Sequence, residues 1–350
     1  MRVVFFFLPL LLFACKPEAK VEEAYASTRI DFQPASAQTF TIRQDTVTNL
    51  RGEQGSVLKV PANAFVLENG SAPVGEVQLE LKEVFSKSDM MANGLSTTSD
   101  GRLIESTGMV FIGASSAGKI LKLRKDKQIW LSIPNKEGFA DADFFQGSFT
   151  EQGFMNWELL EVQSDTIVVK HETIIPLPYG RDCVFVEYYQ QVGDQIFRFK
   201  DSTYMTNDEA ILLARLNADT AAAGSPAIFH SSIKNLGWIN CDRFLEIEKP
   251  TELIVRFKDA DFRQLAYLVF HDRNSILELY FENGEAVSGS LPSGDHVTLM
   301  VMDKKGEKHY FHKQSIILGE HNQVEVQLKR VDLATLQQEV KKIDQEKEKI

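Results

Sequence analysis

Apolar and polar residues alternate along much of the chain after residue 39, with the period of two that is typical of half-buried β-strands. The clearest case is the segment 76–82, in which Val77, Leu79 and Leu81 alternate with polar residues. Similar patterns predict strands at 109–112, 120–123, 129–133, 167–170, 183–189, 253–257, 265–270, 277–281, 297–302 and 309–311. Because short strands with frequent turns are typical of β-sandwiches and β-barrels, we expect a mainly β fold.

Turn residues separate these predicted strands. Asn69-Gly70, Asn93-Gly94, Asp100-Gly101 and Asn283-Gly284 are pairs that suit tight turns with positive φ. The segment 303–306 also predicts a turn, before the strand at 309–311.

Two segments have helical rather than strand patterns. Thr206 and Glu209 form a capping box ahead of a helix predicted at 210–223, which Gly224 and Pro226 end. In the tail, Leu333, Leu336, Val340 and Ile343 recur at helical spacing. We expect that tail helix to dock on the last sandwich; a free helix and a coiled coil are the alternatives.

These patterns predict two β-sandwich domains, at 38–163 and 249–330. A mixed α/β middle segment with one helix occupies 164–248, and a C-terminal helix occupies 331–350. Residues 15–37 are rich in Lys, Glu, Ala, Ser and Pro and lack apolar periodicity, so they predict a flexible tether.

Residues 1–14 form a short leader, in which Arg2 precedes an apolar run from Val3 to Ala14. The run is shorter than the roughly 20 residues that a spanning helix needs, and it has the length of a secretory leader. Ala14 followed by Cys15 resembles the lipobox of bacterial lipoproteins. The resemblance implies cleavage between Ala14 and Cys15 and lipidation of Cys15 with diacylglycerol and an N-acyl chain such as palmitate. An ordinary secretory leader is the alternative.

The resemblance to lipoproteins implies a cell-envelope protein held by lipid, in the outer membrane, facing either the periplasm or the cell surface. The net charge of −11 becomes −12 when the leader, with Arg2 as its only charge, is removed. An acidic surface repels phosphate backbones, so we expect no nucleic-acid partner. The membrane would be bound through the acyl chains.

Three stretches resemble known modules. Leu58–Phe65 followed by Gly75–Leu81 resembles the β-sandwich of ankyrins and netrin receptors, with Asn63 where that family usually has glycine; this module mediates protein contacts. The corner at Leu291–Gly294 is similar to carboxypeptidase regulatory domains. Leu236–Phe244 resembles a signature of uncharacterised bacterial envelope lipoproteins.

The stretch 236–244 is unusual in composition and supplies the candidate structural or partner residues, which are Trp238, Asn240, Cys241, Asp242, Arg243 and Phe244. One interpretation is an inter-domain clasp with Trp238 and Phe244 buried; the other is a partner-binding patch. An oxidising envelope permits a disulfide between Cys183 and Cys241, and two buried free thiols are the alternative.

The chain contains no convincing catalytic or ligand motif. Gly113–Lys119 has phosphate-loop spacing, but Ile120 replaces the magnesium-binding Ser or Thr, so a hairpin is expected and no nucleotide. His296, His309, His312 and His321, and the pairs Asp141/Asp143 and Asp259/Asp261, do not have the spacing of a metal site. We therefore expect no cofactor, no metal and no enzymatic activity.

The function that this sequence predicts is non-enzymatic binding or scaffolding of an envelope protein by an anchored lipoprotein. The alternative is a surface protein that binds or processes glycans, with Trp130, Trp157 and Trp238 as candidates for stacking on sugar rings. Two coplanar, solvent-facing aromatic side chains in a groove would favour the glycan hypothesis, and burial of all three tryptophans would remove it.

Overall fold

The computed structural model describes residues 36–160, 172–177, 181–192, 195–206, 228–257, 265–319 and 322–346. The leader, the cleavage site at Ala14 and Cys15, nearly all of the predicted tether and the predicted helix at 210–223 lie outside these residues, as does the predicted strand at 167–170. The described part is mainly β, as the sequence predicts. No helix in it is long and apolar enough to cross a lipid bilayer.

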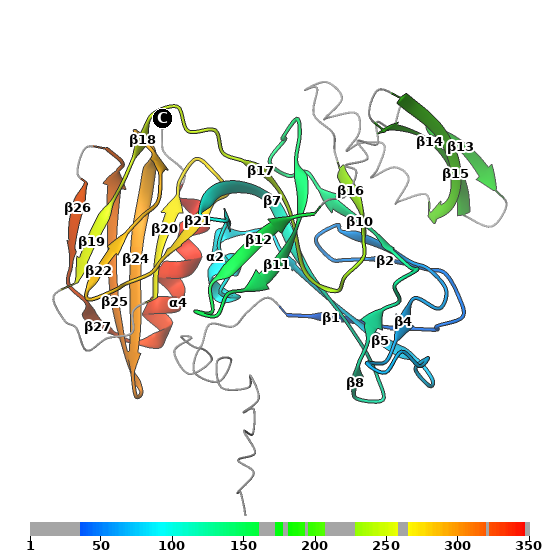
Figure 1. Cartoon of the computed structure of the whole chain (residues 1–350), viewed down its shortest axis with the longest axis horizontal. Helices are drawn as coiled ribbons and strands as arrows, with labels where there is room; N and C mark the ends of the chain where they lie inside the picture. The colour runs from blue at the N-terminus through cyan, green and yellow to red at the C-terminus, as the bar shows by residue number, and fades with distance from the viewer. Residues whose placement is uncertain are drawn as a thin grey trace, which may run out of the picture.

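The N-terminal half consists of two sheets, on the right of Figure 1. The large sheet has the order β1-β5-β7-β17-β11-β12, with β6 and β8 also paired to β7. Its strands are β1 (Gln38–Ile42), β5 (Val77–Val84), β6 (Thr98–Ser99), β7 (Arg102–Ser116), β8 (Lys119–Ile120), β11 (Asp143–Phe149), β12 (Met155–Leu159) and β17 (Gly237–Phe244).

A second sheet of the N-terminal half packs on the large sheet and has the order β16-β10-β3-β2. Its strands are β2 (Thr48–Arg51), β3 (Val57–Val60), β10 (Ile129–Pro134) and β16 (Ile228–Ile233). A small pair, β4 (Phe65–Val66) and β9 (Lys122–Leu123), forms a separate two-stranded sheet. Residues 228–244, assigned above to the middle segment, thus supply β16 and β17 to these two sheets.

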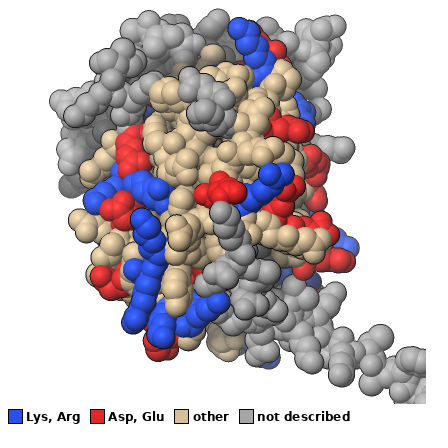
Figure 2. All heavy atoms as spheres, turned by 90° about the vertical axis from the view of Figure 1, so that its left-hand side faces the viewer, with Lys and Arg blue, Asp and Glu red and all other residues tan. Residues whose placement is uncertain are grey.

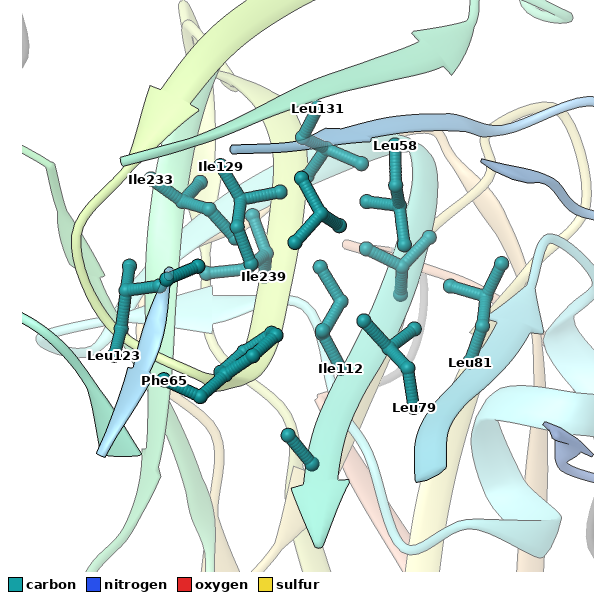
Figure 3. Packing of buried hydrophobic residues seen from close by; sticks show 14 of the residues in the cluster. Leu58, Phe65, Leu79, Leu81, Ile112, Leu123, Ile129, Leu131, Ile233 and Ile239 are labelled. Carbon is teal, nitrogen blue, oxygen red and sulfur yellow. The ribbon is translucent and has the colours of Figure 1, made fainter. Parts of the chain in front are cut away.

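The alternation in β5 points Val77, Leu79 and Leu81 into the core between the two sheets, where all three are fully buried. Figure 3 shows Leu79 and Leu81 beside Ile112 of β7, and Leu58 and Leu131 coming from the second sheet. Each such side chain contributes about 1.5–3 kcal/mol when it is fully buried.

The C-terminal half is a smaller sandwich, on the left of Figure 1. Its five-stranded sheet has the order β21-β20-β24-β25-β27, and its three-stranded sheet has the order β22-β19-β26. These strands are β19 (Ile254–Phe257), β20 (Leu265–Phe270), β21 (Ile276–Leu279), β22 (Glu285–Val287), β24 (His296–Lys305), β25 (Lys308–Ile317), β26 (Gln323–Val326) and β27 (Lys329–Val331).

Five further strands are described outside these sheets. β18 (Pro250–Thr251) pairs with β23 (Leu291–Pro292), and β13 (Glu172–Leu177), β14 (Arg181–Val192) and β15 (Gln195–Thr206) form a three-stranded antiparallel sheet. The strand predicted at 183–189 lies within β14. The turn predicted at 303–306 is shifted, because β24 continues to Lys305 before the chain turns at Gly306.

The helix predicted in the tail is confirmed as α4 (Leu333–Lys342), which is continued by the 3-10 turn η1 (Ile343–Gln345). Leu336, Val340 and Ile343 are buried against the five-stranded sheet. They also share one core with Met90 and Met91 of α2 (Lys87–Ala92), a short helix of the N-terminal half. The tail helix therefore packs at the junction of the two halves (Figure 1).

Several turn predictions are confirmed by the backbone. Gly70, Gly94, Gly101 and Gly284 all have positive φ, and Asn283 has a φ of 52°. Asn63 adopts a φ of 55°. This left-handed conformation favours glycine and is also accepted by asparagine, which explains why Asn63 occupies a corner where the resembled family has glycine.

Candidate functional site

The stretch singled out by the sequence is an interior strand. β17 lies between β7 and β11, with Trp238 opposite Phe111 and Cys241 opposite both Gly108 and Phe144. An irregularity in the pairing with β7 falls between Cys241 and Asp242. Side chains of a strand alternate between the two faces of its sheet, so Cys241 points into one core, whereas Trp238 and Phe244 pack against another.

Cys241 points into the core of the N-terminal half and is completely buried. It is a free cysteine, so it is not bridged to Cys183 in this structure. Burial raises the pKa of the Cys241 thiol well above its ordinary value. A protonated thiol without access to solvent is a poor nucleophile, so Cys241 acts here as a small core residue.

Asn240 and Asp242 belong to a fully buried polar group. The Ser106 hydroxyl donates a hydrogen bond to Asn240 Oδ1 at 2.8 Å, and the Asn240 amide donates to Asp242 Oδ2. Asp242 Oδ1 has no hydrogen-bond partner among the described residues. Burial raises the pKa of Asp242 well above its ordinary value, and the nearby Glu105 raises it further.

Arg243 and Phe244, at the end of the strand, are half-buried and engaged within the chain. Arg243 Nη2 lies 2.9 Å from Oε2 of the buried Glu105, and its guanidinium lies 4.0 Å from the centre of the Phe139 ring. The guanidinium of Arg102 lies 3.9 Å from the centre of the Phe244 ring. These contacts tie the end of β17 to β7 and to the loop before β11.

The three tryptophans have different environments. Trp157 is fully buried and donates its indole N–H to the carbonyl of Ser96 at 2.6 Å. Trp238 is half-buried, with its ring centre 5.3 Å from that of Phe111 and the two planes 59° apart. Trp130, on the outer face of the second sheet, is 37% exposed. Neither criterion set for the glycan hypothesis is met, because one tryptophan is exposed and the half-buried pair is not coplanar.

The remaining candidates are distributed rather than grouped. Gly113–Lys119 forms the hairpin that the sequence predicts, with Ser116 of β7 opposite Lys119 of β8. His309 is buried, whereas His312 lies 3.2 Å from the carbonyl of Gln327. Among the described residues, no three His, Cys, Asp or Glu side chains gather as metal ligands. His321, Asp259 and Asp261 lie outside the described residues.

Sequence reasoning missed the polar contacts that join the two halves. The ammonium group of Lys87, at the start of α2, donates to the carbonyls of Phe270, His271 and Arg273 at 2.5, 3.3 and 3.3 Å. From the C-terminal half, the Asn274 amide donates to the carbonyl of Ser106 at 2.9 Å. Nothing in the sequence around Lys87 indicates this contact, because the carbonyls that accept its hydrogen bonds lie more than 180 residues further along the chain.

Asn274 connects these contacts to the polar group on β17. Its carbonyl accepts from the Ser106 N–H at 3.1 Å, and the Ser106 hydroxyl is the donor to Asn240. Hydrogen bonds of one residue, Ser106, thus link β17, β7 and the turn after β20. These hydrogen bonds hold the large sheet to the C-terminal half, as a clasp would.

Comparison with known proteins does not extend these observations: no protein family, no curated protein and no solved structure matches the chain. What the site can do is therefore argued from its own geometry. Asn240, Cys241 and Asp242 are inaccessible to a ligand in this conformation, and their geometry supports a structural role.

Proposed function

We propose that this protein is a lipoprotein of the cell envelope, anchored through Cys15, that binds or scaffolds another envelope protein without performing chemistry. The anchor rests on the lipobox resemblance of residues 1–15. The binding role is supported by the structure of the junction, where Lys87 and Asn274 join the two halves and the candidate motif is engaged within the protein. A body whose halves share a core is suited to presenting a fixed surface.

The observation that carries the binding role is an aromatic surface at the junction. Tyr280, from the C-terminal half, is 57% exposed, and its ring packs edge-on against Phe154 of the N-terminal half at 5.6 Å. Phe149, on the same β11–β12 hairpin as Phe154, is 44% exposed. Exposed aromatic side chains are enriched at protein interfaces, where they contribute much of the affinity.

The experiment is crosslinking in intact cells followed by capture of the tagged protein. We expect a specific envelope protein to be captured by the wild type and lost with Tyr280→Ser. Val287→Ser is the matched control, because Val287 is similarly exposed, at 55%, on the outer face of the C-terminal sandwich. Equal capture by both variants, or capture of no envelope protein, would count against the proposal.

The second candidate function, glycan binding or processing, is favoured by one observation. Trp130 is 37% exposed and lies opposite Lys59 and Ser232 on neighbouring strands, so its ring is flanked by polar side chains. Titration calorimetry with envelope oligosaccharides tests this function. Binding that is lost in Trp130→Ala would favour it over protein binding.

A further inference from the structure

Among the described residues, the two most exposed large apolar side chains lie at the same end of the large sheet. Val74 is 87% exposed and Ile120 is 82% exposed. The hydroxyl of Ser116, the last residue before the hairpin turn, donates to the carbonyl of Val74 at 3.1 Å, and Ser115 is opposite Ile120. We call Val74, Lys119 and Ile120 the β8 tip; β8 marks it at the lower right of Figure 1.

The chain next to the β8 tip is basic, although the protein as a whole has a net charge of −11. The segment 119–127 contains five basic residues and one acidic residue. Glu68 and Glu76 adjoin it, and five basic against three acidic residues leave a local charge of +2. Lys122 is paired with Glu68 at 2.6 Å and Arg124 with Asp126 at 2.7 Å. The excess positive charge therefore belongs to Lys119, Lys125 and Lys127.

This combination of exposed apolar and basic residues differs from the face of the C-terminal half. On the face of the C-terminal half shown in Figure 2, Lys and Arg are interspersed with Asp and Glu. The exposed Arg256 of β19, for example, lies 2.7 Å from Glu285. Exposed apolar side chains next to unpaired basic residues are typical of surfaces that bind anionic lipid.

We propose that the β8 tip contacts the anionic lipid surface of the membrane that holds the anchor, with Ile120 and Val74 entering the headgroup region. The proposal rests on the proposed lipid anchor. One or two apolar side chains bind weakly by themselves, but the anchor keeps the tip at a high effective concentration next to the lipid. The contact would fix how the body is oriented on the membrane.

The covalent reach of the chain permits this contact. Residues 16–37 can span at most about 75 Å between Cys15 and the start of β1. Gln38 is opposite Leu81 of β5 and Ile42 is opposite Val77, so β1 runs towards the tip. At the rise of a β-strand, Val74 lies within about 25 Å of Gln38 along the sheet.

The test uses the full-length lipidated protein in vesicles of phosphatidylglycerol and phosphatidylcholine, with brominated lipid as a quencher of tryptophan fluorescence. Ile120→Trp places the reporter at the tip. Val287→Trp is the matched control on the C-terminal sandwich, and the unsubstituted protein gives the background from Trp130, Trp157 and Trp238. We expect about half of the added emission to be quenched for Ile120→Trp and almost none for Val287→Trp.

The second part of the test varies the charge of the lipid and of the β8 tip. Quenching of Ile120→Trp should fall in vesicles of phosphatidylcholine alone, and it should fall when Lys119→Glu is added. Protein that floats with the vesicles but shows no quenching of Ile120→Trp would overturn the lipid contact while leaving the anchor intact, and the tip would then suit an acidic protein. Protein that does not float with the vesicles would instead overturn the anchor on which the contact rests.

Discussion

Glu83 allows the packing of the two N-terminal sheets to be tested at one side chain. It lies on β5 of the large sheet and is 2% exposed. Its carboxylate accepts from the N–H groups of Gln54 and Ser56, at 2.8 and 2.9 Å, in the loop between β2 and β3. It also accepts from the Gln38 amide at 2.9 Å. One carboxylate therefore joins β1, β5 and the second sheet.

The effect of replacing Glu83 on stability can be estimated from these three hydrogen bonds. Glu83→Gln keeps the size of the side chain but replaces one accepting oxygen with an NH2 group, so at least one buried N–H would face another donor. Hydrogen bonds to a charged group contribute about 1.5–3 kcal/mol each, and an unsatisfied buried group costs about 1–3 kcal/mol. We expect Glu83→Gln to lower the free energy of unfolding by about 2–4 kcal/mol.

The assay is urea denaturation followed by circular dichroism and tryptophan fluorescence. The two probes should agree before a free energy is extracted, because separate cores can unfold separately. Glu80→Gln is the control: Glu80 is on the same strand, but its side chain is 41% exposed and lies 3.5 Å from Lys82. We expect it to change stability by less than about 1 kcal/mol. A loss in Glu83→Gln no larger than in Glu80→Gln would refute the reasoning.

Three further substitutions test the junction. The raised pKa of Asp242 means that the folded protein holds this proton more tightly than the unfolded chain, so stability should fall as the pH rises above about 4 and through the raised pKa. Asp242→Asn should remove that fall in urea denaturation across pH, and an unchanged pH dependence would contradict the assignment. Lys87→Met leaves three carbonyls without their donor and should lower the free energy of unfolding by about 1–3 kcal/mol. An unchanged midpoint of thermal unfolding would contradict this prediction. Leu336→Ala removes most of a fully buried side chain and should lower the free energy of unfolding by about 2–5 kcal/mol. An unchanged midpoint of thermal unfolding would mean that α4 is not docked.

Local patterns in the sequence predict the local structure of this protein. The alternation of Val77, Leu79 and Leu81 predicts both the strand and its buried face, because one face of β5 meets a core. The tail helix is predicted for the same reason, since Leu336 and Val340 are at helical spacing and pack on one side. Asparagine or aspartate followed by glycine marks turns because these residues accept positive φ.

The site could not be predicted in the same way. β17 has buried residues on both faces, including polar Asn240 and Asp242, so it lacks the alternation that identifies a half-buried strand. Its polar partner Ser106 is 134 residues away from Asn240 in the sequence. Unusual composition singled out the stretch, but its position between β7 and β11 depends on pairing that no local pattern encodes.

The central claim is that a rigid β-rich body is held on the envelope by lipid at Cys15. Metabolic labelling with a palmitate analogue, combined with salt-washed membrane fractions of the wild type and Cys15→Ser, tests it most directly. We expect wild-type protein to carry the label and stay with the membrane. Cys15→Ser should carry no label and be released, with its circular dichroism unchanged. Unlabelled wild-type protein, or Cys15→Ser that stays membrane-bound after the salt wash, would contradict the account.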